Sequence, residues 1–268
     1  MIAPRERQLP VNEYFEQDVA FWQEIYEKDD VLGVIYRERA ARAVNEVDRL
    51  RVKNGSKVLE VGCGAGLVAI DLAQRGFLVE ATDSTPAMIA RTRRNAERAG
   101  HSARLNASLA DVHELQYPDG VFALVMGLGV LPWLHSPATA LKEMSRVLQP
   151  GGHLLVTADN RGRLTHLLDP LFNPFLQPIR HGLGHGRPEA AYAKTMWRRK
   201  VDRDLATAGF RKQRSFTVGF APFTILGREV AKGATALAIN IRLQKLADQN
   251  LPFLHSMGCH YVVVAQKQ

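Results

Sequence analysis

Cysteine is scarce in this sequence, which has only Cys63 and Cys259 among its 268 residues. Two cysteines cannot build the disulfide framework of a small secreted protein, so we expect a chain that works in a reducing, cytoplasmic compartment. The sequence has no run of about 18 apolar residues, so no transmembrane segment is expected, although peripheral membrane contact stays open. The first residues also lack the apolar stretch of a secretory signal.

Acidic residues are too few to offset the basic ones. The net charge is +8, and residues 161–214 alone hold twelve Lys or Arg against four Asp or Glu. A basic surface of this kind can face nucleic acid, anionic lipid or an acidic ligand, or it can be only a solvated face. The histidines, cysteines and acids do not recur at the intervals of metal ligands, so no metal site is predicted.

Short apolar runs alternate with helical segments from Lys57 to Asn160. This alternation is typical of an α/β fold with parallel strands and right-handed crossovers. Strands are predicted at 57–61, 78–82, 104–109, 122–126 and 153–158, and helices at 67–75, 86–99 and 137–148. The flanking segments are predicted as helix at 14–50, a proline-interrupted insertion at 161–195, helix at 197–208, strands at 216–220 and 260–265, and a helix-rich stretch at about 226–248.

A glycine-rich turn follows the first predicted strand. Residues 58–66 read Val-Leu-Glu-Val-Gly-Cys-Gly-Ala-Gly, and a helix is predicted directly after them. Glycine allows a tight turn and the close approach of a ligand, and the helix N-terminus presents free N–H groups. A dinucleotide site needs its third glycine at position 67, where this chain has Leu67. The spacing therefore argues against NAD or FAD and favours a ligand without a pyrophosphate.

Acidic residues follow the next two strands. Asp83 comes at the end of the second, where a carboxylate can accept both hydroxyl protons of a ribose. Asp111 follows the third, where a carboxylate can accept from an exocyclic amine such as that of adenine. Ligands of such sheets bind at the carboxyl ends of the strands, so both groups are expected at one site.

The glycine turn, Asp83, Asp111 and the Gln149-Pro150-Gly151-Gly152 turn resemble, in order and spacing, the class I S-adenosylmethionine (SAM)-dependent methyltransferases. The resemblance is strong over residues 55–160. Within the family, the chain looks most similar to small-molecule methyltransferases of the ubiquinone/menaquinone-biosynthesis type. It implies an α/β Rossmann-like, doubly wound sheet of seven mostly parallel strands with the last antiparallel. One domain is expected over 1–268, with a helical lid at 1–52, a SAM-binding core at 53–160, an insertion or lid after strand 5 at 161–195, and the rest of the sheet at 196–268.

The resemblance also implies which residues bind SAM. Glu60 is expected to orient the glycine loop and meet the amino group of the methionine moiety, and Asp83 is expected to hold the ribose. The other implied contacts are Gly62, Cys63 and Gly64 to methionine and ribose, Ser84, Met88, Asp111 and Val112 to adenine, and Gly127 and Leu128 beside the sulfonium. Cys63 is expected to be a small buried residue and not a nucleophile.

His135 is the candidate general base, because it comes shortly after the fourth strand, on the sheet edge where the methyl group is expected. The alternative is a surface histidine that caps the helix beginning at Pro137. Segments outside the core are expected to cover the site and to contact the acceptor. The candidates for this contact are Tyr14, Trp22, Tyr26, Tyr36, Arg37 and His166, with plain packing as the alternative role for most of them. In the insertion, His166, His181 and His185 are further candidates for the general base.

The sequence after the fourth strand narrows the acceptor. It lacks the Asn/Asp-Pro-Pro-Tyr/Phe signature of methyltransferases that act on nucleobase amines, and it lacks a Pro-Cys pair. We therefore expect methyl transfer from SAM, leaving S-adenosylhomocysteine (SAH), to a small aromatic, quinone-like or lipid-like molecule, with O- or C-methylation favoured over N-methylation. An RNA methyltransferase that uses the basic 161–214 region and a SAM-binding protein without turnover are the alternatives. No stable nucleic-acid partner is expected, and the chain is expected to be a monomer or homodimer.

Overall fold

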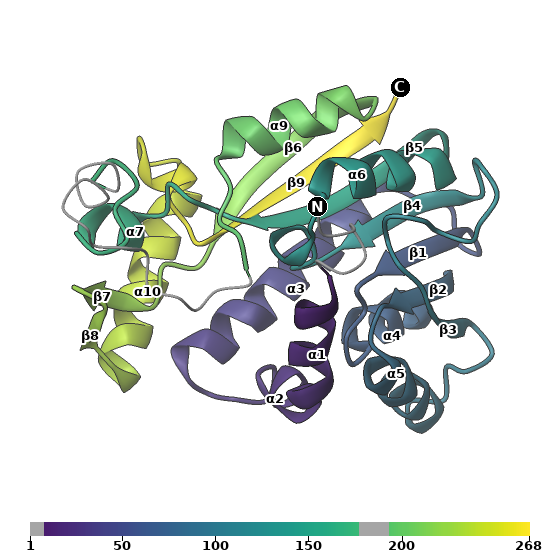
Figure 1. Ribbon diagram of the computed structural model, residues 1–268, viewed down its shortest axis with the longest axis horizontal. Coiled ribbons are helices and arrows are strands. Elements are labelled where there is room, and N and C mark those ends of the chain that lie inside the picture. Colours follow the sequence, from purple (N-terminus) through teal and green to yellow (C-terminus); the bar gives the residue numbers. More distant parts are fainter. Residues whose placement is uncertain (1–7, 177–192) are drawn as a thin grey trace.

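The computed structural model describes residues 8–176 and 193–268. Its centre is a seven-stranded sheet in the order β3-β2-β1-β4-β5-β9-β6 (Figure 1). Neighbouring strands are parallel except β9, which runs antiparallel to both β5 and β6. The predicted Rossmann-like sheet with an antiparallel last strand is therefore confirmed. The strands are β1 (Lys57–Val61), β2 (Leu78–Asp83), β3 (Leu105–Leu109), β4 (Phe122–Gly127), β5 (Leu148–Asp159), β6 (Phe210–Val218) and β9 (His260–Lys267).

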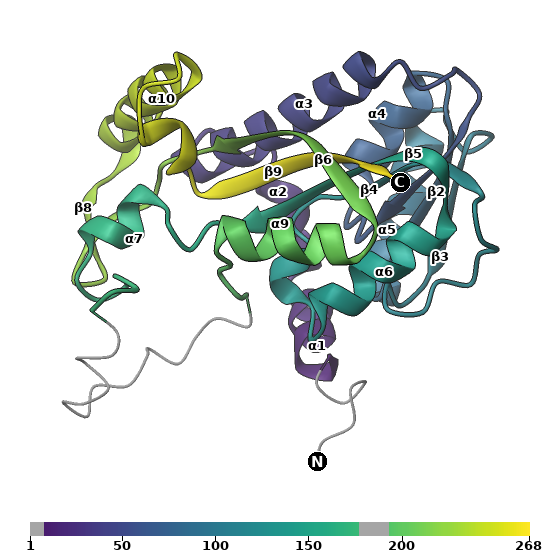
Figure 2. The same cartoon turned by 90° about the horizontal axis from the view of Figure 1, so that it is seen from above.

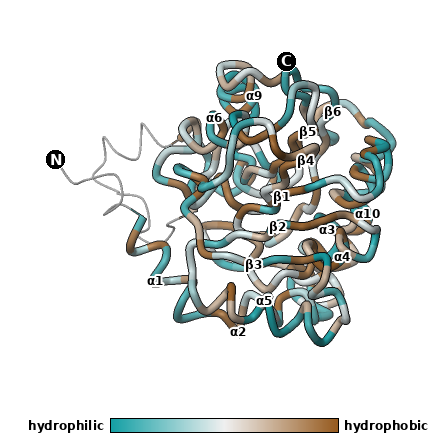
Figure 3. The backbone as a smooth tube through the Cα atoms, turned by 90° about the vertical axis from the view of Figure 1, so that its right-hand side faces the viewer, coloured by the Kyte–Doolittle hydropathy of each residue, from teal (hydrophilic) through white to brown (hydrophobic). Residues whose placement is uncertain are grey.

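Helices cover both faces of this sheet (Figure 2). On one face lie α3 (Val31–Leu50), α4 (Leu67–Gln74) and α5 (Pro86–Arg98), and on the other lie α6 (Pro137–Val147) and α9 (Arg198–Thr207). Neighbouring side chains of β1 alternate between the two layers, with Val58 in the α4 layer and Leu59 in the α6 layer. Because both faces are buried, β4 at the centre of the sheet is apolar throughout its length (Figure 3).

The strand order reverses between β1 and β4. The chain runs from β1 outward to β2 and β3, then crosses back to β4 on the other side of β1. The loops after β1 and β4 therefore leave in opposite directions and open a crevice at the carboxyl ends of these strands. This is the edge to which the glycine turn and the strand-end acids belong.

The N-terminal segment is three helices, so the prediction of one helix over 14–50 is wrong. The helices are α1 (Leu9–Gln17), α2 (Val19–Glu24) and α3. The Asp30 side chain accepts a hydrogen bond from the Gly33 amide at 2.8 Å and so starts α3 as an N-cap. Asn12 of α1 accepts a hydrogen bond from the Ser84 hydroxyl after β2 at 3.0 Å, which places α1 across the crevice.

The C-terminal part differs from the prediction in two elements. The strand expected at 216–220 begins at Phe210 and ends at Val218, followed by Gly219 at a positive φ of 79°. The helix-rich stretch begins with a hairpin of β7 (Phe223–Ile225) and β8 (Arg228–Ala231), and only then forms α10 (Gly233–Asp248). The insertion contains α7 (Leu164–Leu168), whereas His181 and His185 lie outside the described residues. Within residues 8–176 and 193–268, no helix has the length and apolarity needed to cross a bilayer.

Candidate cofactor and acceptor site

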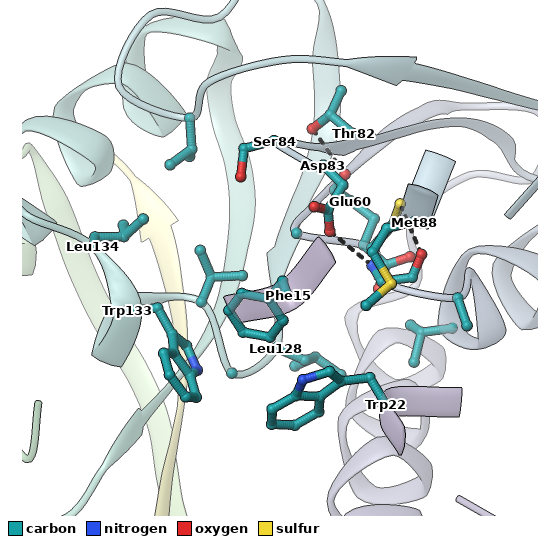
Figure 4. A pocket seen from close by; sticks show the side chains of 18 of the residues that line it. Phe15, Trp22, Glu60, Thr82, Asp83, Ser84, Met88, Leu128, Trp133 and Leu134 are labelled. Atoms are coloured by element: carbon teal, nitrogen blue, oxygen red, sulfur yellow. Dashed lines mark hydrogen bonds between the residues drawn. The ribbon is translucent and has the colours of Figure 1, made fainter. Parts of the chain in front are cut away.

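A cavity lies in the crevice, between the carboxyl ends of the strands and the helices α1 to α3 (Figure 4). Its empty space is about 1270 Å³ when the open mouth is counted. Polar groups from β1, β2 and the loop after β3 line one part, and aromatic side chains from α1 to α3 line another.

The glycine turn uses its three glycines differently. Gly62, Gly64 and Gly66 all have positive φ, at 64°, 54° and 80°. A Cβ on Gly64 would meet no atom of the described residues within 4 Å, so the backbone there is open. A Cβ on Gly66 would come within 2.6 Å of Thr92 on α5. Gly64 therefore gives a ligand access to the backbone, while Gly66 allows the turn to pack against α5.

Asp83 holds the glycine turn in place. Its carboxylate accepts hydrogen bonds from the amide of Gly64 at 3.0 Å and from the amide of Thr85 at 2.9 Å. Burial raises the pKa of Asp83 above its ordinary value, against these hydrogen bonds. The carboxylate lines the cavity beside Ser84 and Met88, so it combines a structural contact with a ligand-facing position.

Glu60 is a buried carboxyl group with an unsatisfied oxygen. It is 3% exposed, and its Oε2 atom has no hydrogen-bond partner among the described residues. Burial raises the pKa of Glu60 to about 8. A buried carboxylate in a cavity is stabilised most by a cationic group, so an ammonium placed against Glu60 fits the site.

Asp111 forms a short contact with a histidine that the sequence did not single out. Its Oδ1 accepts from the backbone amide of His113 at 2.9 Å and lies 2.6 Å from His113 Nδ1. The His113 hydrogen bond lowers the pKa of Asp111. Asp111, Val112 and His113 all line the cavity, and Oδ2 of Asp111 has no hydrogen-bond partner within residues 8–176 and 193–268.

Arg39 was also missed by sequence reasoning. It lies on α3, is 4% exposed and lines the cavity. Its Nη2 donates to the Tyr26 hydroxyl at 3.2 Å, and its guanidinium lies over the Tyr36 ring with 4.5 Å to the centroid. The Nε atom is buried without a partner among the described residues. A Cβ on Gly129 would come within 3.1 Å of Nη1, so the loop after β4 approaches this cation closely. A buried cation of this kind calls for an anionic ligand.

An aromatic wall closes the cavity from the side of the N-terminal helices. Phe15, Trp22 and Trp133 lie opposite Asp83 and Ser84 in Figure 4. The centroid of the Phe15 ring is 4.8 Å from that of Trp133 and 5.1 Å from that of Trp22. These rings make an apolar surface that suits an aromatic or greasy molecule.

Most of the predicted cofactor and acceptor residues lie together. The cavity is lined by Glu60, Gly62, Cys63, Gly64, Asp83, Ser84, Met88, Asp111, Val112 and Leu128, and by Trp22, Tyr26 and Tyr36. Cys63 is 7% exposed, its Sγ lies 3.6 Å from Thr92 Oγ1, and burial raises its pKa well above the ordinary value. These features match a buried small residue and not a nucleophile.

Other predicted residues do not line the cavity. Gly127 lies inside the sheet, where a Cβ would come within 3.1 Å of Val61, and Leu128 and Gly129 take the cavity position instead. Tyr14 stacks behind the wall on Trp133 at 5.6 Å. Arg37 donates to the backbone carbonyls of Tyr26 and Lys28, away from the cavity.

His135 and His166 are likewise absent from the cavity lining. The His135 ring stacks on His113 at 3.8 Å, and its amide donates to the Gln8 side chain at 3.1 Å, so it joins the start of α1 to the loop after β4. His166 lies on α7 and stacks on Phe172 at 5.3 Å.

Comparison with known families agrees with this geometry. Residues 59–156 match the family model described as a methyltransferase domain, and they contain the glycine turn, Asp83 and Asp111. Over residues 59–156 the chain is thus similar to a methyltransferase domain. Its cofactor is SAM, and the unsatisfied Glu60 and Arg39 groups fit the ammonium and carboxylate of that molecule.

Named relatives share the core of the methyltransferase domain. The chain is 37% identical over 131 residues to a malonyl-[acyl-carrier protein] O-methyltransferase of Halorhodospira halophila, covering 48% of this chain and 43% of the relative. It is 30% identical over 124 residues to a ubiquinone biosynthesis O-methyltransferase of Pseudomonas aeruginosa, covering 46% and 53%. The matched regions thus span about half of these relatives.

Solved structures share the fold over a longer stretch. Magnesium protoporphyrin IX methyltransferase of Synechocystis with bound SAH superposes with a TM-score of 0.66 at 15% identity, covering 97% of this chain and 99% of that one. The [4+2]-cyclase SpnF superposes with a TM-score of 0.58 at 21% identity, covering 85% and 80%. At these identities the likeness shows the fold alone.

Proposed function

We propose that this protein transfers a methyl group from SAM to a small apolar or aromatic acceptor, with an oxygen atom as the favoured target. The observation that carries the proposal is the division of one cavity into two chemically different parts. One part offers the glycine turn and the carboxylates Glu60 and Asp83, and the other offers the rings of Phe15, Trp22 and Trp133. The names of the two O-methyltransferase relatives support an oxygen target.

In this proposal the chain's own residues hold the cofactor by matching its charges. Glu60 binds the ammonium of the methionine moiety. Arg39 binds its carboxylate, because no other Lys or Arg among the described residues lines the cavity. Asp83 accepts from the ribose hydroxyls, and Asp111 accepts from the adenine amine. When bound, SAM supplies an electrophilic methyl group.

The N-terminal helices act as a cover in the same proposal. Asn12 and Glu16 of α1 form hydrogen bonds with Ser84 and with the amide of Ala87, so α1 spans the mouth next to β2. A covered site excludes water from the methyl group. We infer that residues 1–52 belong with the core as one methyltransferase domain over 1–268.

The basic region does not support an RNA acceptor. None of the described Lys and Arg residues of 161–214 lines the cavity. Several of them pair with acids of their own surface, including Lys200 with Asp204 and Lys212 with Asp202. Acidic neighbours thus neutralise part of the positive charge on α9 and β6.

Calorimetry followed by a transfer assay tests the proposal. We expect purified protein to bind SAM and SAH, and not NAD, at one site per chain. Incubation with methyl-labelled SAM and a panel of phenols, quinols, fatty acids and RNA should then label an apolar small molecule. Absence of SAM and SAH uptake refutes the proposal, and binding without labelling of any acceptor indicates a SAM-binding protein without turnover.

A further inference from the structure

The cavity contains a fourth carboxylate that the cofactor assignment does not use. Asp159 ends β5 and lines the cavity beside Tyr26, Tyr36 and Arg39. Glu60, Asp83 and Asp111 belong to β1, β2 and the loop after β3, on the other side of β4 in the strand order. Asp159 is therefore separated from the other three carboxylates by the loop of Leu128 and Gly129.

The register of β5 places Asp159 next to that loop. Thr157 Oγ1 accepts a hydrogen bond from the Gly129 amide at 2.6 Å. Residues two apart on a strand point to the same face, so Asp159 follows Thr157 on the face that meets the loop after β4. Leu128 and Gly129 line the cavity at the same place. Asp159 thus lies just beyond the part of the cavity assigned to the cofactor.

A buried histidine holds the Asp159 carboxylate from behind. His260 on β9 pairs with Asp159 across the antiparallel ladder, and its Nδ1 lies 3.2 Å from Asp159 Oδ1. Burial lowers the pKa of His260, so a neutral ring donates its Nδ1–H to the carboxylate. The His260 ring is in turn packed edge-on against Tyr36 at 5.6 Å.

The charges around Asp159 keep it ionised. Burial acts to raise its pKa, but the His260 hydrogen bond and the positive charges of Arg163 and Arg39 hold it below the ordinary value. No ion pair within 4 Å joins Asp159 to Arg39 or Arg163 in the part of the chain that the structure describes. Asp159 Oδ2 has no hydrogen-bond partner among those residues and can accept a proton donor from the cavity.

We propose that Asp159, positioned by His260, binds the hydroxyl group of a phenolic acceptor and accepts its proton. This inference rests on the proposed methyltransferase function and adds the substrate class, a neutral phenol among the rings of Trp22, Tyr26 and Tyr36. Methylation of a hydroxyl oxygen forms one carbon–oxygen bond, breaks one carbon–sulfur bond and releases the hydroxyl proton. The Asp159 carboxylate is the group placed to take that proton.

The test uses 4-nitrophenol as the probe, since its phenolate absorbs visible light and its neutral form does not. The SAH-loaded protein is titrated with the probe at several pH values. A hydrogen bond to an anionic carboxylate favours the neutral phenol, so the bound probe should ionise at a pH about one unit or more above the free probe. The comparison of free with bound 4-nitrophenol needs no variant. SAH binding is measured separately by calorimetry.

Variants then assign the shift to the two residues. Asp159→Asn should abolish the shift, and His260→Leu should reduce it. His260→Asn, whose side-chain amide can replace the Nδ1–H donor, should restore it. Asp202→Asn is the matched control, because Asp202 accepts from the Tyr261 hydroxyl next to His260 in sequence but does not line the cavity.

Several results overturn the inference without touching the proposed function. These are no saturable binding of 4-nitrophenol, a downward shift of its ionisation, or an unchanged shift in a folded, SAH-binding Asp159→Asn protein. If the His260→Leu protein shifts the ionisation of 4-nitrophenol as much as the wild type does, His260 does not position Asp159. If the wild-type protein does not bind SAH at all, the proposed function is refuted instead.

Discussion

The Asp83 carboxylate accepts a hydrogen bond from the backbone amide of Gly64 at 3.0 Å. This contact joins the end of β2 to the glycine turn after β1, 19 residues earlier in the chain. The same carboxylate faces the cavity. One side chain therefore both shapes the turn and offers acceptor sites to a ligand, and its removal should affect both.

Asp83→Ala should weaken SAH binding about tenfold or more, because charge-assisted hydrogen bonds to the ribose disappear. Isothermal titration calorimetry gives the affinity. Glu80→Ala is the matched control, since Glu80 lies on the same strand but accepts from Asn106 and Tyr117 away from the cavity. Equal affinities of wild-type and Asp83→Ala protein would remove Asp83 from the ribose site.

Glu60 should make the stability of the ligand-free protein fall with rising pH. Its folded-state pKa of about 8 lies above the ordinary value of 4.5, so the folded state holds a proton that the unfolded state loses between these values. The free energy of unfolding should decrease across this window, by at most about 1.4 kcal/mol per pH unit. Urea unfolding of wild-type and Glu60→Gln protein at pH 5 to 8 measures the difference, which should grow with pH in favour of the variant.

Glu60 should also couple SAM binding to proton release. The ammonium of SAM favours the ionised carboxylate, so affinity should rise with pH up to about 8 and this rise should be smaller in Glu60→Gln. The comparison isolates Glu60, because the cofactor's own groups titrate identically with both proteins. Parallel pH profiles for the two proteins would contradict the assignment.

Arg39→Met should weaken SAH binding tenfold or more while leaving 5′-methylthioadenosine binding nearly unchanged. The second ligand has the adenosine and sulfur of SAH but no carboxylate for the guanidinium to bind. Arg42→Met is the control, because Arg42 lies on the same helix and binds Asp248 outside the cavity. Equal losses for both ligands in Arg39→Met would indicate a collapsed cavity and would refute the carboxylate contact.

Gly66→Ala and Gly64→Ala should separate stability from binding. The first places a Cβ 2.6 Å from Thr92 at a φ of 80°, so it should lower the free energy of unfolding by about 2 kcal/mol or more. The second meets no atom of residues 8–176 or 193–268 within 4 Å, so it should cost only about 1 kcal/mol of backbone strain. SAH affinity should fall more for Gly64→Ala. The reverse order in urea unfolding and calorimetry would contradict these roles.

Local patterns predicted the central strands and the helices between them. β4 is a short apolar run, and the helices α4 and α5 end two residues before Gly76 and Gly100. The strand at Phe210–Val218 was placed too late because it is the edge strand of the sheet. Its residues Arg211 to Arg214 are exposed, and charged edge strands lack the apolar pattern of buried ones.

The N-terminal helices show a second limit of prediction from apolar spacing. The apolar spacing alone predicted a helix that continues through Asp30, whereas the Asp30 carboxylate caps a new helix at that point. The apolar side chains of this segment serve two purposes, since Phe15 and Trp22 face the cavity and Val44 and Val47 pack on the sheet. A hydrophobic pattern does not distinguish burial against the core from burial against a ligand space.

The sequence by itself determined the glycine turn and the acids at the ends of β2 and β3, because these positions follow from strand ends that a local apolar pattern marks. Only the tertiary structure brought Arg39 beside Gly129 and Asp159 beside His260. These partners are 90 and 101 residues apart in the chain, and the packing of α3 and the antiparallel pairing of β9 with β5 decide their contact. Local order thus predicts the glycine turn and the strand-end acids of the cofactor site, while its arginine and the Asp159–His260 pair arise from long-range packing.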